Sequence, residues 1–235
     1  MLRLLLRRTA RMTTATLAAS QGQSLSESNK VHFPTDPKLP GKCFEPRQND
    51  PTGDYTPNPS KSLPLAPARK ALVDDIISLY EIGATVECMQ RYTPDAVYND
   101  ELGYADDRYK IAGQWFGLPY IFREAKSRGH EVVTNDRDLI QFLHEVEWHP
   151  KLVPKTLTLR SLVSLALDPA TVDSEFIRVK YHKDQASAKD YSNEGPGAML
   201  KKWQAEATAA MLSAVDSNLK AFESDKGAGS KQDEP

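Results

Sequence analysis

Hydrophobic positions take on helical spacing near residue 68. From there apolar side chains recur three, four and seven positions apart, the spacing that places them on one face of a helix. The members of this face are Leu72, Val73, Ile76, Ile77 and Tyr80, followed by Gly83, Ala84 and the run 86–89. The pattern predicts one long amphipathic helix from about Ala68 to Tyr92. It must end before Pro94, because proline cannot continue a helix.

Two further helices are predicted in the next 30 residues. Asp106 or Asp107 can cap a helix that runs through Trp115, because an aspartate side chain accepts a bond from a free backbone N–H of the first turn. Pro119 is placed to begin another helix, because proline is favoured in the first turn. That helix would end at Gly129, with basic residues in its last turn.

Strand patterns dominate from there on. After a short strand candidate at 96–98, the segments 139–148, 156–167 and 175–183 are rich in β-branched, aromatic and leucine residues. Prolines separate the three long segments. A last helix is predicted from about Gly197 to Phe222, and we expect its apolar face to pack on the sheet rather than on a partner. That face consists of Leu200, Trp203, Ala207, Met211, Ala214 or Val215, and Leu219.

The order of these elements predicts an α+β fold. Helices come first and a meander of strands follows, so the two kinds of element segregate instead of alternating. We expect the N-terminal helices to pack in the concave face of a curved antiparallel sheet, giving a cone-like domain that a long C-terminal helix closes.

The first 26 residues have the composition of a mitochondrial transit peptide. They contain four arginines, no acidic residue before Glu27, and many serines, threonines and alanines. The prediction is a mitochondrial protein whose segment 1–26 is removed after import. A disordered basic tail is the alternative, and translation from Met12 would give a cytoplasmic form.

Domain boundaries follow from composition. The stretch from Val31 to Pro67 holds nine of the 16 prolines, so residues 27–66 are a linker or an arm that docks on the domain. Residues 67–222 contain all the periodic segments and form the predicted domain. The tail 223–235 has no apolar period and is expected to be disordered.

Composition excludes several classes of protein. The chain has 235 residues, 40% of them hydrophobic, and a formal net charge of −2. The run that most resembles a membrane segment, residues 1–8, is charged and far shorter than the roughly 20 apolar residues of a membrane span. Two cysteines cannot form a disulfide framework. Near-neutral charge argues against nucleic acid as the main partner.

Residues 92–103 carry a family resemblance. This passage of aromatic, acidic turn, short strand and Asp-x-x-Gly turn resembles the nuclear transport factor 2-like (NTF2-like) superfamily, especially its SnoaL-like and ketosteroid-isomerase-like members. Asp100 and Gly103 match the aspartate and glycine of the family's turn, whereas Glu101 stands where the family usually has proline. The block Tyr181-His182-Lys183-Asp184, with residues 189–195, is similar to uncharacterised eukaryotic members.

The resemblance implies a role for Asp100. In the isomerase-like enzymes the matching aspartate removes a proton next to a carbonyl, while hydroxyl and acid groups stabilise the enolate. Asp100 is therefore the candidate general base and Tyr80, on the inner face of the first helix, a candidate donor. The simpler interpretation, which we favour, is that Asp100 is a turn carboxylate that accepts backbone N–H bonds.

Other candidate site residues come from strand alternation. His144 lies on the more apolar face of the segment 139–148, so it projects inward as a core histidine or as a pocket acid or base. Four aromatic residues are candidates for an apolar ligand pocket, with the core as the alternative: Tyr98, Tyr104, Trp115 and Trp148. The histidines have no metal-ligand spacing, so we assign no metal and no cofactor.

Two classes of function remain open. The favoured one is a non-catalytic protein that binds a small apolar molecule or a protein subunit, with a homodimer through the sheet face as one form. The alternative is a lyase or isomerase acting on a small apolar carbonyl compound, with Asp100 as base and Tyr80 or His144 as its helper.

Overall fold

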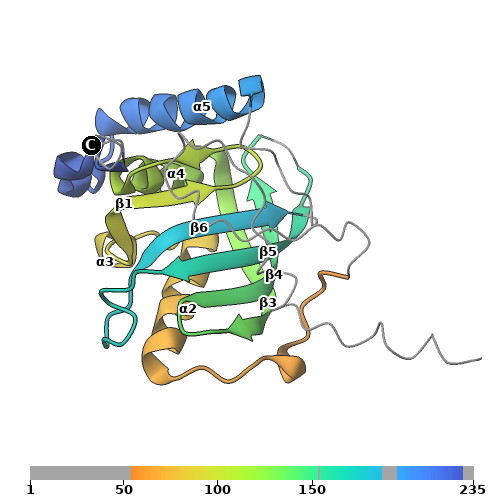
Figure 1. Cartoon of the computed structure of the whole chain (residues 1–235). Coiled ribbons are helices and arrows are strands. Elements are labelled where there is room, and N and C mark those ends of the chain that lie inside the picture. Colours follow the sequence, from red (N-terminus) through yellow and green to blue (C-terminus); the bar gives the residue numbers. More distant parts are fainter. Residues whose placement is uncertain (1–53, 153, 187–194, 230–235) are drawn as a thin grey trace, which may run out of the picture.

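The computed structural model describes residues 54–152, 154–186 and 195–229, and in the last range the side chains from residue 203 onward. It confirms the α+β class (Figure 1). In the described part of the chain, no helix has both the length and the apolar character to cross a membrane. The predicted transit peptide 1–26 lies outside the described residues.

The described end of the proline-rich arm docks on the domain. After a 3-10 turn, η2 (Pro59–Lys61), the arm runs beside strand β3 (Phe122–Asn135), and the Leu63 N–H donates to the Val132 carbonyl at 2.9 Å. Tyr55 is buried against Leu143 and Leu162. Of the two predicted roles for residues 27–66, the docked one therefore applies to residues 54–66.

The long first helix is two helices in the structure. Helix α2 (Pro67–Tyr80) ends where Ile82 takes a φ of 62° and the Gly83 N–H donates to the Ser78 carbonyl at 2.8 Å, a left-handed helix stop. Helix α3 (Val86–Met89) follows as one short turn. The apolar periodicity predicted helical residues correctly on α2 but could not show this reversal.

The predicted helix from Pro119 to Gly129 is wrong. Helix α4 (Arg108–Ile121) begins at the predicted cap, where the Asp107 side chain accepts a bond from the Lys110 N–H at 2.8 Å. It continues to Ile121 with Pro119 inside its last turns, and the chain then enters β3. The backbone groups of this segment form hydrogen bonds with β4 (Leu139–Pro150). These bonds outweigh the preference of its residues for a helix.

Six strands form one mixed sheet in the order β2-β1-β6-β5-β4-β3. The remaining strands are β1 (Tyr92–Asn99), β2 (Tyr104–Ala105), β5 (Leu157–Leu167) and β6 (Val179–Ala186). The prediction of a purely antiparallel sheet is wrong for one pair of strands, because β1 runs parallel to β6. The long connection through α4 and four strands allows this parallel return.

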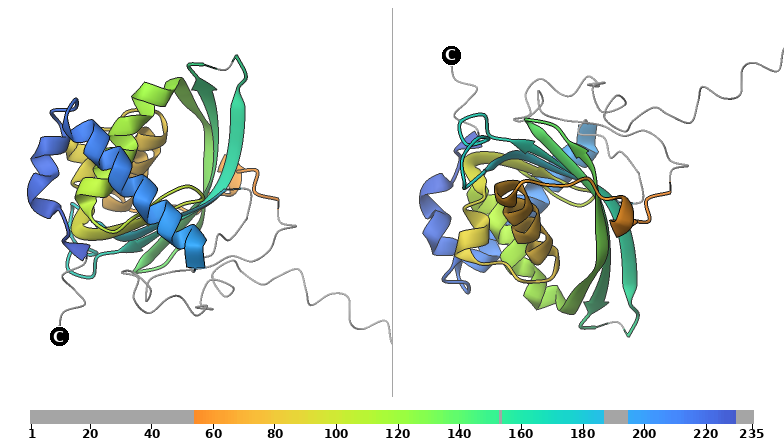
Figure 2. Two further views of the ribbon diagram at one scale, coloured as in Figure 1. Left: turned by 90° about the horizontal axis from the view of Figure 1, so that it is seen from above. Right: turned by 90° about the horizontal axis from the view of Figure 1, so that it is seen from below.

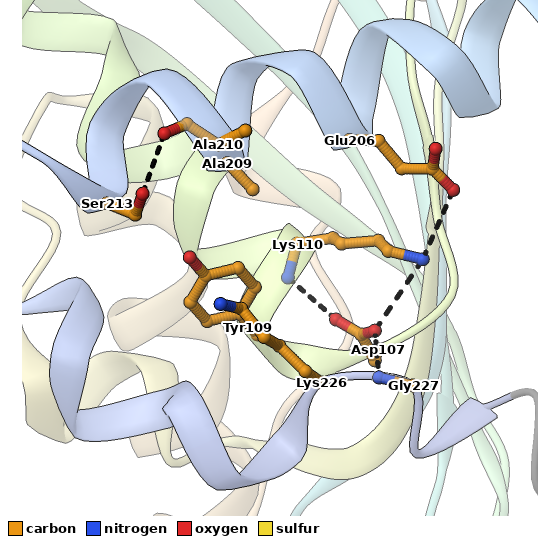
Figure 3. Close-up of a pocket in the computed structure, with 9 residues that line it drawn as sticks. All are labelled: Asp107, Tyr109, Lys110, Glu206, Ala209, Ala210, Ser213, Lys226 and Gly227. Carbon is orange, nitrogen blue, oxygen red and sulfur yellow. Dashed lines mark hydrogen bonds and ion pairs between the residues drawn. The ribbon is translucent and has the colours of Figure 1, made fainter.

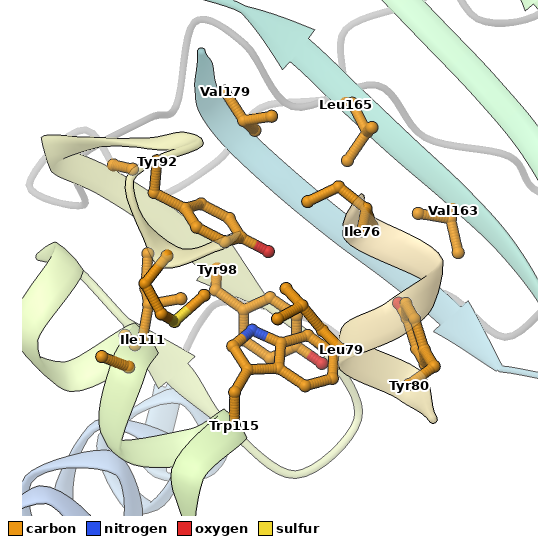
Figure 4. Close-up of a cluster of buried hydrophobic side chains, with 14 of the residues drawn as sticks. Ile76, Leu79, Tyr80, Tyr92, Tyr98, Ile111, Trp115, Val163, Leu165 and Val179 are labelled. Carbon is orange, nitrogen blue, oxygen red and sulfur yellow. The ribbon is translucent and has the colours of Figure 1, made fainter. Parts of the chain in front are cut away.

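The main core lies between the sheet and two helices. The sheet curves around α2 and α4 (Figure 2), and side chains from both helices and from the sheet form one buried cluster. Figure 4 shows part of it, with Ile76 and Leu79 of α2 near Trp115 of α4 and Val163 of β5. Apolar side chains from both sides of this layer exclude water from the core.

The last helix contacts the edge strand β2 of the sheet but packs mainly on α4. Helix α5 (Gly195–Ser213) contacts it through small residues, and a Cβ added to Gly113 would lie 3.0 Å from the Ala209 Cα. Within residues 203–213 of α5, the buried side chains are Ala205, Ala209 and Leu212. The predicted apolar face is therefore wrong at Trp203, Met211 and Val215, which are exposed, whereas its last member, Leu219, is buried beyond the end of the helix. Small residues allow closer helix approach than the large stripe would.

The C-terminal residues 223–229 are packed, in contrast to the expected disorder of this tail. The 3-10 segment η3 (Leu219–Asp225) follows α5, and Asp225 is buried and accepts a bond from Arg108 Nε at 2.7 Å. The Gly227 N–H donates to the Asp107 side chain at 2.8 Å. Polar contacts, rather than an apolar period, hold this segment, which is why its sequence pattern did not reveal it.

Candidate functional site

A cavity of about 260 Å³ lies between the inner face of the sheet and the C-terminal half of α4. This is smaller than most sites for drug-sized ligands, so it fits a small molecule. Its walls are mostly apolar and aromatic, and its polar groups are few. The lining residues that carry the chemistry are Tyr80, Tyr98, Asp100, Glu101, Ser161 and Asp184.

Asp184 is a buried carboxyl of this cavity whose pKa is raised. It lies on β6 with 9% of its surface exposed, and burial raises its pKa to about 6. The hydroxyls of Ser161 and Tyr80 lower this pKa by less, while the negative charges of Asp100 and Glu101 raise it. Its Oδ1 is buried and has no hydrogen-bond partner among the described residues. Such an unpaired oxygen is costly, and is typical of functional sites.

A chain of hydrogen bonds leads from Asp184 into the core. The Tyr80 hydroxyl donates to Asp184 Oδ2 at 2.8 Å and lies 3.1 Å from His182 Nε2. The other ring nitrogen, Nδ1, lies 2.7 Å from the Tyr92 hydroxyl. Elements far apart in sequence, α2, β1 and β6, are joined by this chain.

The direction of the chain follows from charge. Burial lowers the pKa of His182 to about 3, so the ring is neutral at pH 7, with one donor and one acceptor nitrogen. The Tyr80 hydroxyl uses its only proton in the hydrogen bond to Asp184. Its oxygen must therefore accept the hydrogen bond from the Nε2–H of His182. Nδ1 then accepts from Tyr92. Every member therefore orients its neighbour, and the Tyr80 hydroxyl is held on the ionised form of Asp184.

Asp100 has the contacts of a turn carboxylate. Its Oδ1 accepts from the backbone N–H groups of Leu102 at 2.7 Å and Gly103 at 2.5 Å, and its Oδ2 accepts from the Tyr98 hydroxyl at 2.8 Å. The family resemblance pointed to this residue as the base. In the structure both of its oxygens are engaged, so taking a proton would weaken bonds that hold the turn.

Five of the seven predicted site residues line the cavity: Asp100, Tyr80, Tyr98, Trp115 and Trp148. Tyr98 and Trp115 lie with their ring centroids 5.4 Å apart (Figure 4). Burial raises the pKa of Tyr98 well above its usual range, so its hydroxyl stays protonated. Sequence reasoning therefore found the aromatic wall.

His144 and Tyr104 are not among the residues that line this cavity. His144 is buried and points inward as predicted, but it lies at the edge of the Tyr80 ring and its Nε2 is 3.0 Å from the Ser127 hydroxyl. Burial lowers its pKa to about 4. Tyr104 pairs with Asn99, the neighbour of Tyr98, so alternation places it on the opposite face of the sheet, in another cluster.

Asp184 and His182 were missed as site residues, although they lie in a block already noted for its resemblance. A β-bulge explains the omission. Consecutive β5 residues Ala166 and Leu167 pair with Tyr181 and Val179, so Lys180 is an extra residue on β6. This extra residue reverses the alternation and turns His182 and Asp184 inward. One signal was available, namely an acid and a histidine two positions apart inside a strand.

A second cavity, of about 340 Å³, lies between α4, α5 and the C-terminal segment (Figure 3). Lys110 crosses it and forms ion pairs with Asp106 at 2.6 Å, and with Asp107 and Glu206 at 3.7 Å. Lys226 lies over the Tyr109 ring, 4.4 Å from its centroid. Its charged groups are already paired with one another, so the smaller apolar cavity is the better candidate site.

Comparisons with known proteins found no matching family model and no matching curated protein. Solved structures do match. One is an NTF2-like protein from Anabaena variabilis, with 10% identity over 55% of this chain and 91% of that one and a TM-score of 0.43. Another is a hypothetical protein with a ketosteroid isomerase-like fold from Catenulispora acidiphila, in complex with trimethylamine, with 13% identity over 52% and 85% and a TM-score of 0.40.

A third match is an NTF2-like protein of unknown function from Burkholderia pseudomallei, with 10% identity over 53% of this chain and 93% of that one and a TM-score of 0.39. At such identities and scores these three structures say nothing about family, activity or the role of any residue. The eukaryotic branch stays a prediction.

Proposed function

We propose that this protein is an isomerase or lyase that acts on a small apolar carbonyl compound, with Asp184 rather than Asp100 as the general base. One observation carries the proposal: a buried carboxylate with an unpaired oxygen and a pKa of about 6 in the wall of an apolar cavity. A base whose pKa lies near the working pH combines the ionised state with useful proton affinity.

The proposed reaction begins with proton removal from the carbon next to the carbonyl. Asp184 takes the proton, and the electron pair of the C–H bond moves onto the carbonyl oxygen to give an enolate. We assign the Tyr98 hydroxyl as the donor to this oxygen, because it lines the cavity and its raised pKa keeps it protonated; its single proton would turn from Asp100 Oδ2 to the enolate. In an isomerase Asp184 returns the proton to another carbon, and in a lyase a β-substituent leaves with the electron pair.

Tyr80, His182 and Tyr92 act as positioning residues in this proposal. Their chain fixes Asp184 Oδ2 and leaves Oδ1 for the substrate. A fixed carboxylate reacts faster because its orientation is set before the substrate binds. The Tyr80 hydroxyl also stabilises the ionised carboxylate, which must be restored after each turnover.

Proton exchange tests the proposal without knowledge of the natural substrate. The full chain would be incubated in D₂O with small ketones such as cyclohexanone and 2-tetralone, and loss of the α-proton signal followed by NMR. Asp184→Asn should lower the catalysed exchange at least about 100-fold, because an amide cannot accept the proton. Tyr98→Phe should lower it about ten-fold, since one oxyanion donor is lost.

Asp100→Asn is the comparison that decides between the two carboxylates. It is expected to retain exchange within about ten-fold of the original protein, because it disturbs the turn but leaves the base. Loss of exchange in Asp100→Asn with activity retained in Asp184→Asn would overturn the assignment. Ketone binding detected through Trp115 and Trp148 fluorescence, without exchange above the buffer rate, would favour the non-catalytic binding function.

A further inference from the structure

A convex corner of the molecule carries exposed apolar side chains with no partner in the described residues. Tyr120 and Ile121 at the end of α4 are 56% and 59% exposed, and Leu152 in the β4–β5 connection is 95% exposed. The Lys151 N–H donates to the Ile121 carbonyl at 3.0 Å, so the two segments lie side by side. We call Tyr120, Ile121 and Leu152 the apolar corner.

Basic residues surround the apolar corner. Arg123, Lys151 and Lys155 are exposed, and none of them forms an ion pair with a described residue. The acidic residue of this stretch, Glu124, is paired with Lys126 at 2.8 Å. The corner is therefore positively charged, although the whole chain has a formal charge of −2.

The apolar corner borders the cavity of the candidate site. Phe122 follows Ile121 directly and lines the cavity, and so does Leu157, at the start of β5 beyond the connection. Two further lining residues, Leu157 and Leu102, are 42% and 73% exposed. The lining of the cavity is therefore exposed at Leu157, near the corner.

We propose that the apolar corner docks on an anionic lipid bilayer and brings the cavity mouth to its surface. Aliphatic side chains at a loop tip can enter the headgroup region, tyrosine is favoured at that interface, and basic residues beside them are attracted to anionic lipids. A bilayer would also be a source of apolar ligand. This last consequence rests on the proposed function, whereas the docking does not.

Charge distinguishes this surface from another apolar one on α5. An exposed apolar stripe is formed there by Met211 of α5 and Val215 just beyond the helix. Residues 203–219 around this stripe contain no lysine or arginine and include Glu206 and Asp216, whereas Lys201 and Lys202 precede Trp203. An anionic bilayer would attract the corner and not the stripe. The α5 stripe therefore offers a matched control.

Hydrogen exchange of the full chain with vesicles tests the proposal. Vesicles of phosphatidylcholine with about 30% phosphatidylserine would be compared with phosphatidylcholine alone. Peptides that cover residues 119–123 and 150–157 should exchange more slowly on the anionic vesicles, and peptides that cover α5 should not change. Because residues 1–26 are basic, the site of protection is the readout rather than the total bound protein.

Substitutions give the second measurement. Leu152→Glu should weaken vesicle binding about ten-fold or more, because an inserted apolar side chain becomes charged. Lys151→Ala and Lys155→Ala should each weaken it roughly five-fold. Met211→Glu should leave it unchanged, and none of these variants should alter ketone exchange measured without vesicles.

Two outcomes would overturn the proposal. One is vesicle binding without protection at the corner, or with equal loss in Met211→Glu, since either result places the contact elsewhere. The other is the absence of vesicle binding, which would leave the corner as a surface for a protein partner. Loss of ketone exchange in Asp184→Asn does not bear on either result, so failure of the docking and failure of the proposed chemistry can be told apart.

Discussion

Replacing Asp184 by asparagine should stabilise the protein at neutral pH, because the amide removes a buried charge. The pKa of this carboxyl rises from 3.8 to about 6 on folding, mainly through burial. At 1.36 kcal/mol per pKa unit, this rise of about two units corresponds to about 3 kcal/mol of unfolding free energy. Few single substitutions of a polar residue raise stability by so much.

The sign of the effect follows from which state binds the proton. Between pH 3.8 and about pH 6 the folded carboxyl is protonated and the unfolded one ionised, so stability falls as pH rises through this window. Below it both states are protonated and the penalty is absent, and above it the penalty is complete. Asp184→Asn should match the original protein near about pH 4 and exceed it by about 3 kcal/mol near about pH 7.5.

Urea unfolding of both proteins at about pH 4.5 and about pH 7.5 measures the difference. Asp100→Asn is the matched control. It weakens bonds from Leu102, Gly103 and Tyr98, and should lower the unfolding free energy by about 1 kcal/mol at both pH values. A difference between Asp184→Asn and the original protein that does not grow with pH would refute the assignment of a raised pKa to Asp184.

Three further predictions concern other parts of the molecule. The catalysed ketone exchange should increase about ten-fold for each pH unit below the pKa of Asp184, about 6, and level off above it, because the base must be ionised; a rate that falls from pH 5 to 7 would contradict this. Asp107→Ala should lower the unfolding free energy by about 2 kcal/mol in urea titrations, since it removes the cap of α4 and the acceptor of the Gly227 N–H, whereas Asp107→Asn should cost about half as much. A fluorescent reporter fused to residues 1–26 should enter mitochondria and lose the segment, and a reporter that stays in the cytoplasm would refute the transit peptide.

Local patterns predicted those elements whose side chains obey one period throughout. The inward face of β4, with His144, Val146 and Trp148, is as alternation predicts, and all three are buried. The Asp107 cap was also predictable, because an N-cap depends on a side chain and the three residues after it. Both features depend only on neighbours in sequence.

Pairing between distant segments decided the rest of the fold. Residues 122–129 contain good helix formers, but they lie beside β4 and their backbone groups bond across the sheet. The face of α5 was misread for a related reason. Periodicity favoured its large residues, whereas the close approach to Gly113 of α4 selects the small ones. Neither partner is visible in the local sequence.

The candidate site shows the same division. The sequence predicted that Tyr98, Trp115 and Trp148 and the carboxylate Asp100 belong to the site. An aspartate before a turn and inward aromatic positions are local features of the sequence. Only the tertiary structure revealed that Asp184 lies in the cavity wall. Its inward direction depends on the single extra residue Lys180 in β6, and its raised pKa depends on burial. A bulge and a desolvated cavity arise from long-range packing, which is why no local period could place this carboxylate in the cavity wall.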